Sequence, residues 1–68
     1  MHYTKKQIVN MGNEELIANF HIHSVKLTIE AHGRGITKAS IQEEKYFVSE
    51  ISKRFNLKEE YLLRLINQ

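Results

Sequence analysis

Residues 12–31 read GNEELIANFHIHSVKLTIEA and predict a helix with two apolar faces. With about 100° of rotation per residue, one face consists of Leu16, Phe20, Leu27 and Ala31. The nearly opposite face consists of Ala18, Ile22, Val25 and Ile29. A surface helix ordinarily has a single apolar stripe, so this helix must be covered on two sides. In a chain of 68 residues, the second cover can come from the same chain or from another molecule.

Glycine and charge mark the two ends of this helix. Gly12 is an acceptable N-cap, and Glu15 in the first turn suits the positive end of the helix dipole. Near His32 the helix is expected to end, because Gly33 suits the left-handed position that follows a helix. Gly35 then lets the chain reverse. Such a short connection predicts an antiparallel neighbour, and therefore a helical hairpin.

The remaining sequence predicts further helices and no strand. Either Thr37 or Ser40 caps the next helix, and Ser40 would form a capping box with Glu43. Asn56 tolerates the left-handed conformation that ends this helix, and Thr4 can cap a short helical turn near the N-terminus. The prediction is an all-α single domain over residues 1–68. It has three main helices at about 13–32, 38–55 and 57–67, with a possible short N-terminal turn.

Composition restricts the class of protein. With 41% hydrophobic and 26% charged residues the chain is typical of a globular domain. It has no cysteine, which excludes disulfides and thiolate metal sites, and its net charge of +2 permits nucleic acid binding without requiring it. The sequence has no apolar run of membrane-spanning length and no apolar core of a signal peptide. We therefore expect a cytoplasmic protein that does not enter a membrane.

Residues that could carry chemistry are sparse. His21 and His23 lie two positions apart, so they point to different sides of a helix and cannot share one metal ion. His2 and His32 have no spacing relation to them. The sequence contains no nucleophile motif and no phosphate-binding glycine loop. We expect no metal, no cofactor and no enzymatic activity.

Residues 48–66, VSEISKRFNLKEEYLLRLI, resemble a helix-turn-helix DNA-binding motif. The positions that such a motif buries are all apolar here: Val48, Ile51, Phe55, Leu57, Leu62 and Leu65. The resemblance implies DNA contacts from basic side chains in and near its second helix: Lys53, Arg54, Lys58 and Arg64. Glu59 and Glu60 depart from the motif, because they fall where that helix would meet phosphates.

Three short segments resemble a pattern in small helical proteins of phages and prophages of Gram-positive bacteria. They are residues 11–17 (MGNEELI), 35–38 (GITK) and 49–55 (SEISKRF). The hairpin is also similar to the small sporulation antikinases, which block a histidine kinase by docking a helical surface. These resemblances imply a product of a mobile element that acts by binding a host or rival macromolecule.

Two functional hypotheses follow. The first is a homodimeric regulator or inhibitor of a host or antiviral-defence protein, for example a CRISPR effector. Its expected interface is apolar: Ala18, Ile22, Val25, Ile29, Leu62, Leu63 and Ile66. The alternative is a helix-turn-helix transcriptional regulator that binds DNA. One structural question stays open. Either the C-terminal segment of residues 57–66 folds back onto the face formed by Ala18, Ile22, Val25 and Ile29, or that face meets its copy in a dimer.

Overall fold

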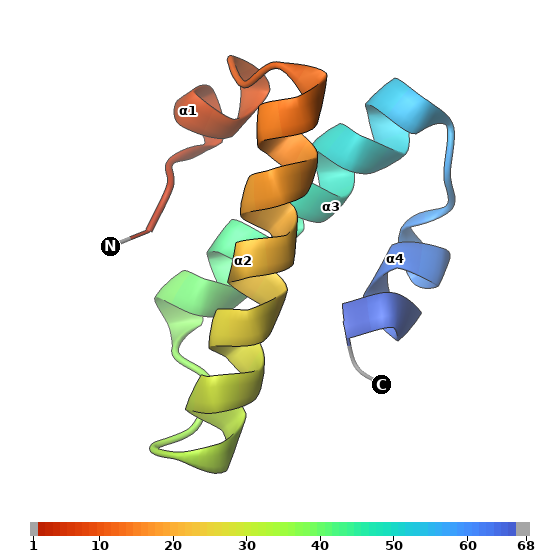
Figure 1. Cartoon of the computed structure of the whole chain (residues 1–68). Coiled ribbons are helices and arrows are strands. Elements are labelled where there is room, and N and C mark those ends of the chain that lie inside the picture. The colour runs from red at the N-terminus through yellow and green to blue at the C-terminus, as the bar shows by residue number, and fades with distance from the viewer. Residues whose placement is uncertain (1, 67–68) are drawn as a thin grey trace.

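The computed structural model describes residues 2–66, and the side chains of residues 2–65 (Figure 1). Over this range the chain forms four helices and no strand. They are α1 (Lys5–Val9), α2 (Asn13–His32), α3 (Lys38–Phe55) and α4 (Glu59–Ile66). The predicted all-α class and three main helices are confirmed, and the N-terminal turn is a short helix. No helix in the described part has the length and apolar character needed to cross a membrane.

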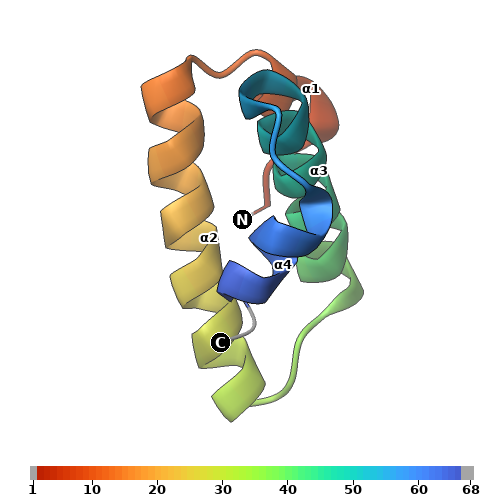
Figure 2. The same cartoon turned by 90° about the vertical axis from the view of Figure 1, so that its right-hand side faces the viewer.

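Helix α3 is the centre of the bundle, since α1, α2 and α4 all pack against it. Helices α2 and α3 run antiparallel through the short loop 33–37, as the predicted hairpin requires (Figure 1). Helix α4 packs against α3, and Figure 2 shows that the side of α2 that faces away from α3 is left uncovered.

Threonine side chains start two of the helices. Thr4 and Gln7 form a reciprocal capping box at the start of α1. Thr37 is the N-cap of α3, and its hydroxyl accepts a hydrogen bond from the Ser40 N–H at 3.1 Å. The alternative start at Ser40, with a box to Glu43, is therefore wrong. The Glu43 carboxylate is instead turned toward α2, where it accepts a hydrogen bond from His23.

The connections between helices depend on two residues with positive φ. Asn56 ends α3 in the left-handed conformation (φ 54°, ψ 43°), as predicted. At the end of α2 the prediction is wrong, because Gly33 has a φ of −106° and the left-handed residue is Gly35, with a φ of +99°. The Gly35 N–H donates to the Glu30 carbonyl at 2.8 Å, so the turn closes two residues later than expected.

The core is a single apolar cluster drawn from every helix and from the turn before α2. Its buried members are Ile8, Met11, Leu16, Phe47, Val48, Ile51 and Leu62. Phe47 is fully buried, and its ring meets those of Tyr3, Phe20 and His23 at centroid distances of 5.4–6.1 Å. The predicted inner face of α2 is confirmed at Leu16 and Leu27, which are buried, whereas Ala31 is exposed.

The helix-turn-helix resemblance predicts burial correctly at only half of its positions. Val48, Ile51 and Leu62 are buried as expected. Phe55, Leu57 and Leu65 are 39–49% exposed. At Leu65 the reason is geometric: α4 is only eight residues long, and its buried contact with the core is made through Leu62.

Candidate interaction surface

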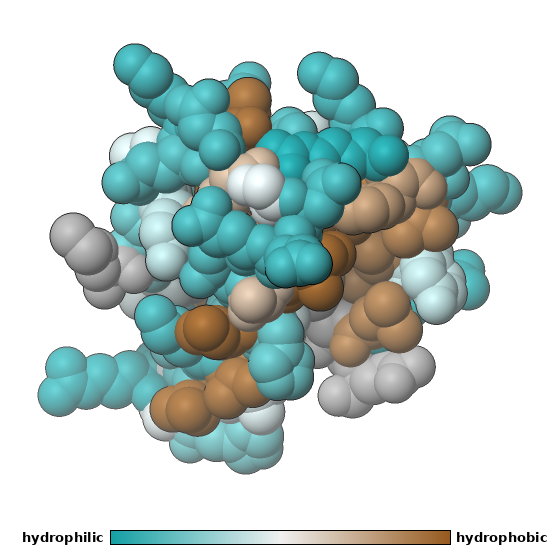
Figure 3. Space-filling view, turned by 45° about the horizontal axis from the view of Figure 1, so that its top comes forward, coloured by the Kyte–Doolittle hydropathy of each residue, from teal (hydrophilic) through white to brown (hydrophobic). Residues whose placement is uncertain are grey.

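A stripe of exposed apolar side chains runs along the outer side of α2. We call Ala18, Ile22, Val25 and Ile29 the α2 stripe. Ile22 is 49% exposed, Val25 47% and Ile29 67%, and Ala18 is exposed as well. Figure 3 shows apolar side chains reaching the surface over the middle of the molecule, where α2 runs, with a second group on the α4 side. Large exposed apolar patches are typical of contact surfaces on soluble proteins.

Helix α4 does not cover the α2 stripe. Leu62, predicted in the interface, is 3% exposed and belongs to the core, and Leu63 is half-buried against that core. The side chain of Ile66 lies outside the described residues. The exposed apolar residues of α4 are instead Tyr61 (52%) and Leu65 (49%), which lie one turn apart on the same side. We call these two residues the α4 pair.

The basic residues predicted for DNA contact differ in their surroundings. Lys53, Lys58 and Arg64 are exposed. Arg54 is half-buried, and its guanidinium donates to the Glu50 carboxylate at 2.6 Å, the Val9 carbonyl at 2.8 Å and the Asn13 side chain at 3.2 Å. These bonds join α3 to the end of α1 and the start of α2, so Arg54 is a structural residue.

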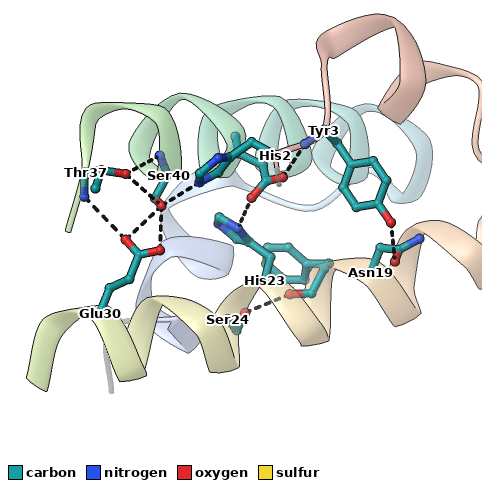
Figure 4. A network of polar contacts seen from close by, with 10 residues as sticks. His2, Tyr3, Asn19, His23, Ser24, Glu30, Thr37 and Ser40 are labelled. Carbon is teal, nitrogen blue, oxygen red and sulfur yellow. Dashed lines mark hydrogen bonds and ion pairs between the residues drawn. The ribbon is translucent and has the colours of Figure 1, made fainter. Parts of the chain in front are cut away.

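A buried hydrogen bond joins α2 to α3 on the inner side of α2 (Figure 4). His23 and Glu43 are 3% and 5% exposed, and 2.8 Å separates His23 Nδ1 from Glu43 Oε1. The second carboxylate oxygen accepts the Tyr3 N–H at 2.6 Å. Because an ionised carboxylate only accepts, the proton lies on His23 Nδ1. His23 Nε2 finds no partner among the described residues.

The sequence prediction did not identify this pair. Its signal was present, since His23 lies within about 40° of both Leu16 and Leu27 on the helical wheel and therefore on the inner face. A cavity of about 120 Å³ adjoins the pair, with Lys26 and Leu27 in its lining. Within residues 2–65, no three His, Asp or Glu side chains converge as a metal site requires.

Ser40 anchors a second group of polar contacts at the start of α3. Its hydroxyl lies 3.0 Å from His2 Nε2 and 2.8 Å from both Glu30 carboxylate oxygens (Figure 4). The one hydroxyl proton goes to the carboxylate, so His2 acts as a donor to Ser40 and does not activate it as a nucleophile. Ser40 is also only 2% exposed. The arrangement ties the N-terminal segment to the α2–α3 hairpin.

Removing the Ser40 hydroxyl is expected to change the titration of Glu30. The hydrogen bond from Ser40 is the largest cause that lowers the Glu30 pKa below 4.5, followed among the lowering causes by the Thr37 N–H. A carboxyl group whose pKa is lower in the folded protein than in the unfolded chain stabilises the fold at pH values above its ordinary pKa. This contribution is lost as the pH falls through the lowered pKa of the folded state. In Ser40→Ala the Glu30 pKa should rise, measured by NMR titration of the side-chain carboxyl. Ser49→Ala, an exposed serine of the same helix, should leave it unchanged, and an unaltered Glu30 pKa in Ser40→Ala would contradict the assignment.

Comparison of the chain with protein-family models, with curated proteins and with solved structures finds no match. The surfaces described above and the sequence resemblances are therefore the basis for a functional hypothesis. Of the predicted interface, the α2 residues lie together on one exposed side, whereas Leu62 and Leu63 lie against the core.

Proposed function

We propose that this protein acts without catalysis, as a dimeric regulator or inhibitor that binds another protein through apolar side chains on the outside of its bundle. The observation that supports the proposal is the α2 stripe, where three large aliphatic side chains are 47–67% exposed on one side of a helix. Hiding apolar surface from water contributes about 25 cal/mol per Å², so these side chains favour a partner. The α4 pair offers a second, smaller contact.

The resemblance to small phage proteins indicates the kind of target. We propose a host or antiviral-defence component, for example a CRISPR effector, in a cytoplasmic setting. The similarity of the hairpin to sporulation antikinases is consistent with docking by a helical surface. If one apolar surface forms the dimer, the other is free to contact the target.

A capture experiment with matched variants tests this proposal. A tagged chain is expected to retain a defined protein from the lysate of a Gram-positive host. Ile22→Glu in the α2 stripe or Leu65→Glu in the α4 pair should reduce its recovery about tenfold, which corresponds to about 1.4 kcal/mol. Ile36→Glu is the control, because Ile36 is 46% exposed but lies in the loop between α2 and α3. Recovery that is equal for all three variants would contradict the proposal.

The alternative function is DNA binding through α3 and α4. The left-handed Asn56 and the burial of Leu62 against α3 favour it, since both are typical of a helix-turn-helix. Glu59 and Glu60, exposed in the first turn of α4, oppose it. A DNA-binding protein would bind random duplex at 50 mM salt (a low concentration for such complexes), lose affinity steeply as salt rises, and bind more weakly after Lys58→Ala or Arg64→Ala. The protein-binding proposal predicts no retention on DNA under the same conditions.

A further inference from the structure

We infer that the occupant of the α2 stripe is a second copy of this chain, whose own α2 lies antiparallel against it. This inference deepens the proposed function, because it rests on the α2 stripe being a contact surface and names what covers it. Four observations support it: the spacing of the α2 stripe, its accessibility, the sizes of its side chains, and the charges at its two ends.

The spacing of the α2 stripe is that of a two-helix seam. Ala18, Ile22, Val25 and Ile29 are separated by four, three and four residues, which is the a/d repeat of a coiled coil. A stripe of this width is narrower than the inner face of a bundle helix. It matches the contact surface of one further helix.

The accessibility of α2 permits a contact along its whole length. In Figure 2 no other helix lies on the side of α2 that faces away from α3. Helix α2 has 20 residues, which gives it a length of about 30 Å. Two copies can therefore meet along the complete α2 stripe while each keeps its own core.

Side-chain size selects an antiparallel register. When Ile22 faces Val25 of the second copy, Ala18 faces Ile29 of the second copy. The smallest member of the α2 stripe, Ala18, is then opposite an isoleucine, and Ile22 is opposite a valine, so the layers have similar volumes. A parallel pair would place Ala18 against Ala18, which leaves a gap beside the layers of isoleucine and valine.

Charge selects the same direction. In this register Glu15, at the start of α2, faces His32 of the second copy, and Glu14 approaches its Arg34. A parallel pair would instead bring Glu15 against Glu15 and His32 against His32. His32 Nδ1 donates to the Thr28 carbonyl at 2.8 Å, so Nε2 donates to a carboxylate only when the ring carries a second proton. Antiparallel helix dipoles add to this preference.

The first experiment measures the mass in solution by sedimentation equilibrium. The wild-type chain should approach twice its 8.0 kDa mass as concentration rises. Ile22→Glu should raise the dimer dissociation constant about 100-fold or more, because the contact would bury a carboxylate from each copy. Ile17→Glu is the matched control: Ile17 is on the same helix and 47% exposed, but lies outside the α2 stripe. It should leave the dimer intact, and circular dichroism should show both variants to be folded.

The second experiment tests the direction of pairing with disulfides, which is simple because the chain has no cysteine of its own. Ala18→Cys and Ile29→Cys proteins, mixed and oxidised mildly, should cross-link to each other. Neither should cross-link to itself, since identical positions near one end of α2 are far apart in an antiparallel pair. Self-cross-linking of Ala18→Cys would overturn the antiparallel arrangement.

The outcomes separate this inference from the proposed function. If the wild-type chain stays monomeric at millimolar concentration, the inference that a second copy occupies the α2 stripe is wrong, even if capture of a target still depends on Ile22. A dimer that Ile22→Glu disrupts supports the inference, even if no target is captured. Disruption of the dimer by Ile17→Glu and not by Ile22→Glu would place the contact elsewhere and also overturn it.

Discussion

Replacing Phe47 by alanine is expected to abolish cooperative unfolding at 25 °C. Phe47 is fully buried at the meeting point of three other rings. Truncation of a core phenylalanine costs about 3–5 kcal/mol. A single core below about 70–80 residues rarely contributes more than about 3–5 kcal/mol of net stability. The variant should therefore lose most of its native helical signal in circular dichroism and show no sigmoidal urea transition.

The matched control is Phe55→Ala, which truncates the same residue type on the same helix. Phe55 is 39% exposed, so its truncation should shift the urea midpoint by much less. Phe47→Leu should restore a cooperative transition, because leucine fills most of the volume. A Phe47→Ala protein with the wild-type midpoint would show that the core is not built around this ring.

The second large effect is expected at Glu43. Its carboxylate accepts hydrogen bonds from His23 Nδ1 and from the Tyr3 N–H. Glu43→Ala leaves both donors without an acceptor, and the orphaned donor of buried His23 alone costs about 1–3 kcal/mol. The free energy of unfolding should fall accordingly in urea denaturation. Glu44→Ala is the control, since Glu44 is the neighbouring acidic residue and is less buried.

A tautomer measurement keeps the Glu43 prediction testable even if the alanine variant unfolds. In the wild type, nitrogen NMR should find the neutral His23 ring protonated on Nδ1. In Glu43→Gln the single amide oxygen can serve Tyr3 while its NH₂ faces the ring, so the ring proton should move to Nε2. Wild-type His23 protonated on Nε2 would contradict the hydrogen bond to Glu43.

The fold could be predicted largely from local signals. Helix boundaries followed from caps at Thr4 and Gly12, from a cap at either Thr37 or Ser40, and from the left-handed Asn56. These features are set by residues close in sequence, which is why the sequence alone defines them. The turn after α2 was mispredicted because two glycines compete for the left-handed position, and only the packing of the loop selects Gly35.

The candidate sites were less predictable, because they depend on contacts between helices. The pattern identified the α2 stripe as a second apolar face, but only the position of α4 shows that nothing in the described chain covers it. Likewise, the charge of Arg54 indicated DNA contact, whereas its bonds to α1 and α2 need the folded bundle. The role of His23 is visible only once α3 brings Glu43 against it.

The attachment of α4 has a consequence for how the native protein fluctuates. Among the described side chains of this helix, Leu62 alone is buried. Local unfolding requires less free energy where few buried contacts must be broken, so α4 can detach while α2 and α3 stay paired. Its amides would then exchange hydrogen with solvent sooner than those of the long helices. Each opening uncovers the side of α3 that carries Val48 and Ile51, so the bundle transiently exposes an apolar surface that its closed form conceals.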